Sequence, residues 1–184
     1  MLLLTCALAR ADDRAAAAAG TYRLAGAAHI EAAPFPARDE EVHADAVLSP
    51  GPAPHSVQVS LAVDTFRCEL RAALDAAGGL TLAAGQRCPV ELSEFGEGHA
   101  EATLRSGSGT VRGGALALRV VFSLSGRVRL RAGGALDAVG AVLSLPGTGG
   151  RWTDVSGELR GQAAGQRDAS RAAEEPPGAA AAAP

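Results

Sequence analysis

Two short segments of the sequence place a histidine between acidic residues at every second position. They are Glu41-Val42-His43-Ala44-Asp45 and Glu97-Gly98-His99-Ala100-Glu101. Alternate side chains of a β-strand point to the same face, so each segment would present an acid, a histidine and an acid together. Imidazole and carboxylate groups bind divalent metals, and two neighbouring strands of this kind could hold one ion. The resulting hypothesis is a metal site formed by Glu41, His43, Asp45, Glu97, His99 and Glu101. The alternative is two solvated outer strand faces, with the small residues packed inward.

A second group of candidate residues is a basic stripe, formed by Arg127, Arg129 and Arg131 on one face of an expected strand. Such a stripe could contact phosphate groups of lipid, lipopolysaccharide or nucleic acid. The favoured alternative is pairing with the acidic strands that carry Glu91, Glu94, Glu97 and Glu101. A net charge of −3, a pI near 5.8 and aromatic residues that do not interleave with the arginines argue against nucleic-acid binding.

The sequence lacks the motifs of common enzymes. It contains no lysine, which excludes Schiff-base chemistry, a P-loop lysine and a Ser-Lys pair. Gly107-Ser108-Gly109 does not match the Gly-x-Ser-x-Gly nucleophile elbow, and it lies in an expected hairpin. It does not begin a Gly-x-Gly-x-x-Gly dinucleotide-binding motif either, because the next glycine, Gly113, comes one residue late. We therefore predict a protein that is not an enzyme and that has no cofactor.

The elements that must carry these residues are strands. Apolar and polar residues alternate in 57–63 and again in 116–124, and glycine- or proline-rich turns separate such runs. Hydrophobic residues make up 47% of the chain and aromatics only 3%, so alanine, valine and leucine must build the core. The prediction is an all-β domain over residues 20–160, an antiparallel meander closed as a small barrel. A β-sandwich is the alternative.

Residues 64–77 read either as a strand or as an amphipathic helix, and we favour the strand. A hairpin folded about Ala77 brings Cys68 opposite Cys88, at a separation that suits a disulfide. This pairing is expected if the protein reaches an oxidising compartment; otherwise both are buried free thiols.

Both ends of the sequence differ from the middle. Residues 1–11 read as a signal peptide, short enough to be truncated, with Ala9-Arg10-Ala11 as its cleavage site. A rival interpretation makes Cys6 the lipidated residue of a lipoprotein. Residues 12–19 form an alanine-rich spacer and 161–184 a flexible, disordered tail. We thus expect export to the periplasm or beyond, and no apolar stretch is long enough to span a bilayer as a helix.

Two motifs carry a resemblance to a known group of proteins. Gly20-Thr21-Tyr22 opens the strand region, and Gly107-Ser108-Gly109 precedes Gly113 and a run of alternating leucines. In these features residues 20–131 resemble the small secreted bacterial proteins of the calycin-like, or lipocalin-like, type. The chain departs from true lipocalins in having Tyr22 where they have tryptophan. The resemblance implies an up-and-down barrel with an apolar ligand cavity and supplies no site residues.

Three functional hypotheses follow. The leading one is an exported protein that binds a small apolar or amphipathic ligand inside the barrel, with Trp152 or Tyr22 closing one end. The second is an envelope structural or interaction protein with a filled barrel, which holds a partner through the basic stripe or the tail. The third is a metal-binding module at His43 and His99. An apolar cavity of several hundred cubic ångströms would favour the first hypothesis, and a packed interior the second.

Overall fold

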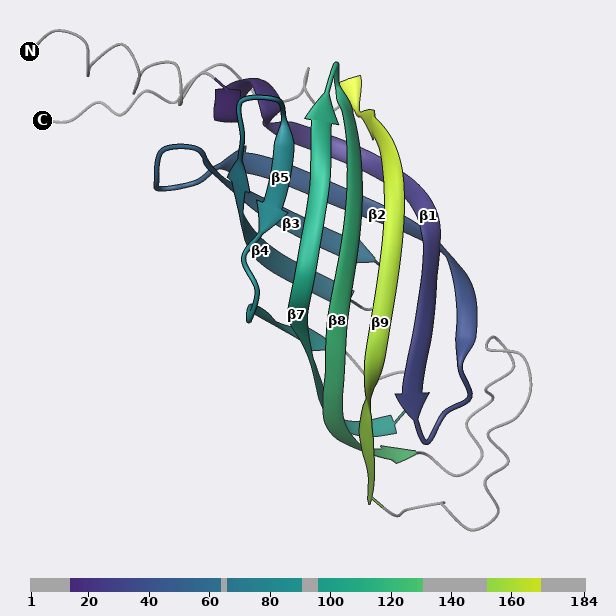
Figure 1. Ribbon diagram of the computed structural model, residues 1–184. Coiled ribbons are helices and arrows are strands. Elements are labelled where there is room, and N and C mark those ends of the chain that lie inside the picture. Colours follow the sequence, from purple (N-terminus) through teal and green to yellow (C-terminus); the bar gives the residue numbers. More distant parts are fainter. Residues whose placement is uncertain (1–13, 64–65, 91–95, 131–151, 170–184) are drawn as a thin grey trace, which may run out of the picture.

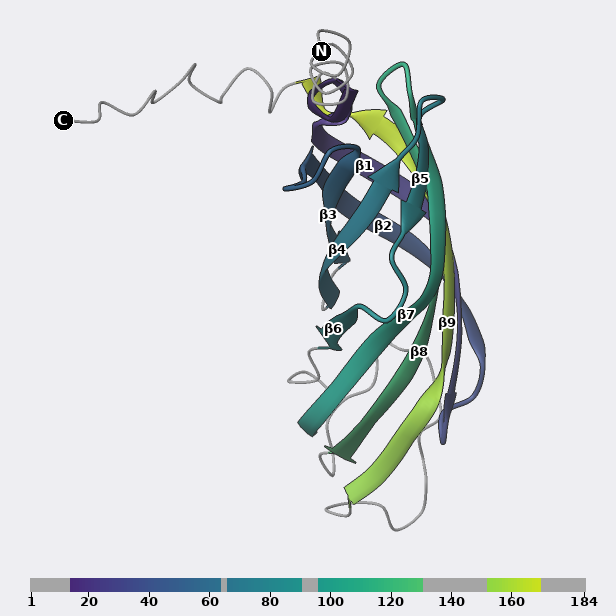
Figure 2. The same cartoon turned by 60° about the vertical axis from the view of Figure 1, so that its left-hand side comes forward.

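The computed structural model describes residues 14–63, 66–90, 96–130 and 152–169, and these form one antiparallel sheet (Figure 1). Its strands are β1 (Gly20–Ala33), β2 (Arg38–Pro50), β3 (Ser56–Val63), β4 (Phe66–Leu74), β5 (Gly79–Leu82), β6 (Arg87–Val90), β7 (Gly96–Arg112), β8 (Ala115–Leu130) and β9 (Trp152–Arg167). The long strands β7, β8, β9 and β1 lie side by side, and the shorter ones complete the curve (Figure 2). None of the helices in the part of the chain that the structure describes is long and apolar enough to cross a membrane.

The strands follow one another as a meander whose first and last members meet. β1 pairs with β2, β2 with β3 and β3 with β4, while β9 pairs with both β8 and β1. β5 and β6 both lie between β4 and β7, and hydrogen-bonded pairing therefore runs round eight strands. The predicted antiparallel meander is confirmed and is barrel-like. The sandwich alternative is wrong, because the strands belong to a single sheet.

One face of each alternating strand is buried inside this curve. In β3, Val57, Val59 and Leu61 are buried and the residues between them are more exposed. The largest fully buried side chains are Tyr22, Phe122, Leu48, Leu70, Leu80, Leu104, Leu116, Val57, Val59 and Cys88. They belong to one core cluster, in which alanines fill the space between the larger side chains. The core is thus built from aliphatic residues with few aromatic rings, as the composition predicts.

The strand interpretation of residues 64–77 is confirmed by β4, which pairs with β3 along Phe66–Ala73. The chain then turns at Asp75, whose carboxylate accepts hydrogen bonds from the backbone N–H groups of Ala77 and Gly79, each at 2.7 Å. These bonds, with Gly79 first, lower the pKa of Asp75 below its ordinary 3.8 because they favour the charged form. Gly78 adopts a φ of 83°, which glycine reaches without steric strain.

The prediction of a disordered tail from residue 161 is wrong for its first residues. β9 continues to Arg167, and Gly161 pairs with both Ala28 of β1 and Val120 of β8. The segment lacks large apolar side chains, which is why its sequence resembles a linker. Ladder hydrogen bonds on both sides hold it, since small residues let the two neighbouring strands approach. Residues 170–184 lie outside the described part.

The predicted spacer also contains structure. Residues 14–18 form a short helix that precedes β1, and Ala15 and Ala18 are buried against the core cluster. The helix lies over one end of the curved sheet (Figure 1). An alanine run is a good helix former, so the local sequence suits this role once tertiary contacts hold it. The predicted signal peptide, with Cys6, lies outside the described residues.

Candidate functional site

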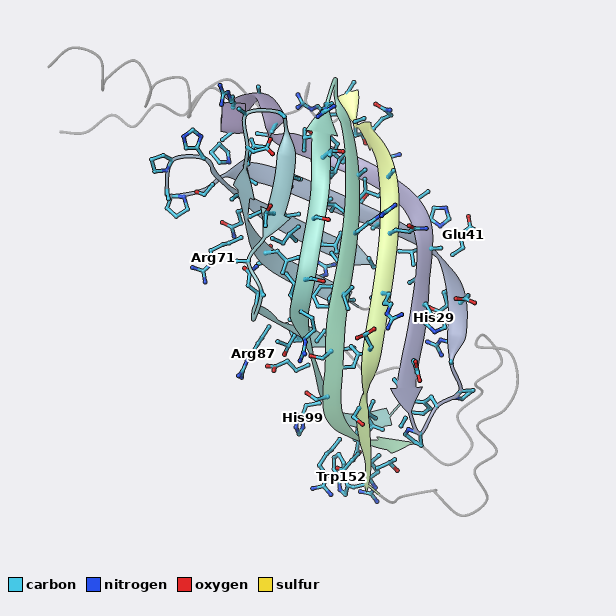
Figure 3. The ribbon with its side chains drawn as sticks, in the orientation of Figure 1. His29, Glu41, Arg71, Arg87, His99 and Trp152 are labelled. Atoms are coloured by element: carbon cyan, nitrogen blue, oxygen red, sulfur yellow. A yellow bond between two sulfur atoms is a disulfide. The ribbon has the colours of Figure 1, made fainter. Side chains whose placement is uncertain are left out.

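The two acid-histidine-acid segments lie on strands that are not neighbours. Glu41, His43 and Asp45 belong to β2, whereas Glu97, His99 and Glu101 belong to β7. Three strands, β1, β9 and β8, separate β2 from β7 in the sheet. Glu41 and His99 accordingly lie far apart in Figure 3. Among the described residues there is no group of three or more His, Cys, Asp or Glu side chains that could hold a metal ion, so the six-ligand hypothesis is wrong.

Within each segment the side chains point outward, as the alternative interpretation requires. His43 contacts Glu41 at 4.0 Å on the same strand. Glu101 pairs with Arg87 of β6 at 3.6 Å. Each of these groups is exposed or half-buried, and exposed ion pairs of this kind stabilise a fold only slightly. The segments are solvated outer faces.

The basic stripe is paired with carboxylates of its neighbouring strands. Arg127 of β8 lies 3.0 Å from Asp154 of β9, and Arg129 lies 3.8 Å from Glu97 of β7. The pairing with an acidic strand is therefore confirmed for Glu97, since β7 and β8 are in register at that pair. Arg131, Glu91 and Glu94 lie outside the described residues. Phosphate binding by this stripe would have to compete with the carboxylates already present.

The predicted disulfide is present and lies inside the core. Cys68 of β4 and Cys88 of β6 are joined, with Cα atoms 5.0 Å apart and both side chains buried. The predicted pairing is confirmed, although the strand that returns from the hairpin is broken between β5 and β6.

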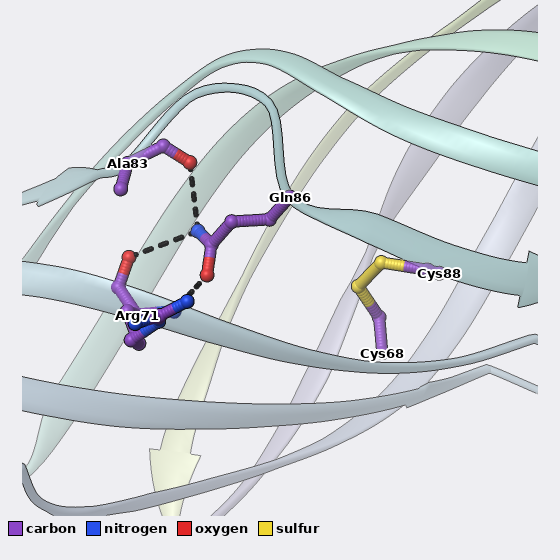
Figure 4. The surroundings of a disulfide bond; sticks show 5 residues. All are labelled: Cys68, Arg71, Ala83, Gln86 and Cys88. Atoms are coloured by element: carbon purple, nitrogen blue, oxygen red, sulfur yellow. Dashed lines mark hydrogen bonds between the residues drawn. A yellow bond between two sulfur atoms is a disulfide. The ribbon is translucent and has the colours of Figure 1, made fainter.

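The side chain of Gln86 spans this break (Figure 4). Its Oε1 accepts from the N–H of Arg71 at 2.6 Å, and its Nε2 donates to the carbonyls of Arg71 and Ala83 at 3.1 and 2.7 Å. The amide thus replaces a backbone pair of the ladder. Sequence reasoning missed Gln86, because only the three-dimensional break gives its amide backbone partners.

A polar cluster closes the end of the molecule beneath the helix of residues 14–18. The buried hydroxyl of Tyr22 donates to the carbonyl of Ala18 at 2.7 Å. Arg167 of β9 donates to the carbonyl of Ala17 at 2.5 Å and to the Tyr22 hydroxyl at 3.0 Å. Its guanidinium also lies over the Tyr22 ring, 5.5 Å from the ring centre. Tyr22 therefore helps to close this end, whereas Trp152 is 49% exposed and closes neither.

The outer face of the four long strands carries a hollow of about 610 Å³. It crosses β1, β9, β8 and β7, and the side chains that line it are mostly alanine, glycine, serine and threonine. Arg119 is the one charged residue among those that line it. The hollow results from short side chains on a continuous sheet, and its lining brings together no acid-base pair and no nucleophile with a base.

With this geometry in view, comparison of the chain with models of protein families, with curated proteins and with solved structures finds no match.

Proposed function

We propose that the protein is an exported, non-enzymatic module of the cell envelope whose barrel-like interior is filled and which acts through its surface. The observation that carries this proposal is the packing of the core. The ten largest fully buried side chains come from every strand except β9, and they form one cluster. Barrels of about eight strands can be filled by side chains alone, and here Ala15 and Ala18 of the helix cover the end of that cluster.

The placement of charged groups supports a non-enzymatic role. Within the described part of the chain, no polar or charged residue is buried. Perturbed pKa values mark active sites in many enzymes, whereas the lowered pKa of Asp75 is explained by a tight turn at the surface. The histidines of the two candidate segments lie on outer faces and are exposed.

Export is supported by the Cys68–Cys88 disulfide. Disulfides persist in oxidising compartments and are rare where cellular thiols keep cysteines reduced. The calycin-like resemblance is part of the proposal, and the alternating burial along the strands and the closed pairing support it.

A second candidate is the carrier of a small apolar ligand, and the end of the sheet opposite the helix of residues 14–18 favours it. There Ala32, Val128 and Val155 form a small separate cluster, and Ile30 and Phe35 pack against it while remaining partly exposed. Partly exposed apolar side chains at the mouth of a barrel are typical of ligand sites.

Uptake of a fluorescent apolar probe, N-phenylnaphthylamine, separates the two candidates. The filled interior predicts no saturable probe binding by the wild-type protein. Leu104→Ala, which removes a side chain with no exposed surface, is tested with benzene instead, because a dry cavity left by one leucine side chain binds a molecule of that size. Benzene binding by this variant and not by the wild type would show that apolar space in this core can be detected. Saturable binding by the wild type would support the carrier and contradict the filled-core proposal.

A further inference from the structure

The ladder of hydrogen bonds around the sheet is interrupted between β4 and β6. We call this interruption the seam, and the curved sheet that it interrupts the wall. On its other side β4 pairs with β3 without interruption from Phe66 to Ala73. Towards β5 and β6, the register of the described residues pairs Ala72–Leu74 with β5 and only Phe66 with β6. Residues 67–71 of β4 thus have no ladder partner on this side, where β6 and the loop between β5 and β6 run past them.

Two sets of bonds stabilise this seam, one covalent and one of hydrogen bonds. The first is the Cys68–Cys88 disulfide, which crosses it from inside the core. The second is the Gln86 amide, with its three hydrogen bonds to Arg71 and Ala83, helped by the Ala83 N–H bond to the Arg71 carbonyl at 2.9 Å. On the far side the same loop is bonded to β7, since Leu104 exchanges backbone bonds with Gly85 and Gln86, each 2.8 Å long. The loop would therefore stay with β7 if the seam opened.

We propose that this seam is a redox latch: the disulfide keeps the wall closed in an oxidising compartment, and its reduction lets β6 separate from β4. The step is thiol–disulfide exchange with a dithiol, such as a reduced thioredoxin-type protein. The donor's two thiols form a disulfide, and their two electrons and two protons convert Cys68–Cys88 into two thiols. Opening would expose Leu70 and Leu82, which are buried beside the latch.

Burial of the latch gives the seam a measurable kinetic signature. Cys88 has no exposed surface and Cys68 very little, so a reductant reaches the intact disulfide only when a local fluctuation exposes it. The rate of reduction by dithiothreitol therefore reports how often the chain around the disulfide opens locally, before the separation of β6 from β4 that follows reduction. Gln86→Ala removes the amide hydrogen bonds and leaves the disulfide and the Ala83–Arg71 backbone bond, so reduction should accelerate on the order of tenfold. Gln58→Ala is the matched control: its amide bonds to Glu69 at 2.9 Å across the intact β3–β4 ladder, and the rate should change less than about twofold.

Hydrogen exchange then locates the opening. After reduction and alkylation, amides of residues 66–72 and 82–90 should exchange faster, while those of β1, β8 and β9 stay protected. The Cys68→Ala/Cys88→Ala double variant should show the same local pattern without any reductant. Equal loss of protection in all strands would make the disulfide a global staple and overturn the proposal. Unchanged protection, or equal reduction rates for Gln86→Ala and Gln58→Ala, would overturn it as well.

Discussion

Three glycines on the inner face of β9 provide a direct test of how closely this strand packs against its neighbours β1 and β8. Gly157, Gly161 and Gly165 are spaced four residues apart, and each pairs with β1 on one side and β8 on the other. Their surroundings differ. A Cβ at Gly165 would lie 2.7 Å from the carbonyl carbon of Arg23 and closer still to its oxygen. A Cβ at Gly157 would lie 2.8 Å from the carbonyl carbon of Glu31. At Gly161 the nearest atom is a methyl carbon of Val120, at 3.3 Å.

These distances set the magnitude expected for each substitution by alanine. Non-bonded carbon atoms prefer about 3.5–4.0 Å, so β1 and β9 must separate by roughly 1 Å to admit a Cβ at Gly157 or Gly165. Such a shift lengthens ladder hydrogen bonds on both sides of the residue, and loss of about two of them costs about 2–4 kcal/mol. At Gly161 the contact is a movable methyl group, so the free energy of unfolding should change by less than about 1 kcal/mol.

Urea unfolding of the three alanine variants, followed by circular dichroism, measures these differences. Gly157→Ala and Gly165→Ala should each unfold at clearly lower urea than the wild type, while Gly161→Ala stays close to it. In thermal unfolding the same difference corresponds to a loss of roughly 5–15 °C for a domain of this size. Equal losses of stability at all three positions would refute this reasoning, because the close backbone contacts at Gly157 and Gly165 would then make no difference.

Three further outcomes are expected. Leu104→Ala should lower the free energy of unfolding by about 2–5 kcal/mol, because a fully buried side chain leaves a cavity; a loss below about 1 kcal/mol would mean that the interior is loosely packed. Tyr22→Phe should lower the free energy of unfolding by about 1 kcal/mol, because the hydroxyl loses its bond to Ala18. Amide exchange at Ala19, whose N–H bonds to the helix, should become faster, and unchanged exchange would exclude the Tyr22 hydroxyl as the anchor of the helix. Asp75→Asn should be less stable than the wild type at neutral pH. Because the folded pKa of Asp75 lies below 3.8, the difference should persist above that pH and vanish as the pH falls through the folded pKa; a pH-independent difference would contradict this.

The strands and the disulfide are the parts of the structure that the sequence predicts well. Alternation in 57–63 and 116–124 identifies β3 and β8, because one face of each strand is buried. Cys68 and Cys88 were placed by hairpin geometry, which depends only on residues close in the sequence.

The errors concern features that depend on which strands become neighbours. Histidine and acidic residues at alternate positions cannot reveal that β2 and β7 lie four places apart in the sheet. Likewise, the residues from Gly161 to Arg167 form a strand because β1 and β8 flank them, although their own composition resembles a linker. Long-range pairing brings Gln86 near the backbone of Arg71, and it brings Arg167 near the Ala17 carbonyl and the Tyr22 hydroxyl.

A native mass spectrum of the protein purified from an exporting host tests the central claim, a filled interior in an exported protein, most directly. The expected result is the bare polypeptide mass, free of adducts, and a denatured mass two hydrogens below the reduced value because of the Cys68–Cys88 bond. A bound adduct of a few hundred daltons that is lost on denaturation would contradict the filled interior, and a fully reduced chain would contradict the exported, latched state.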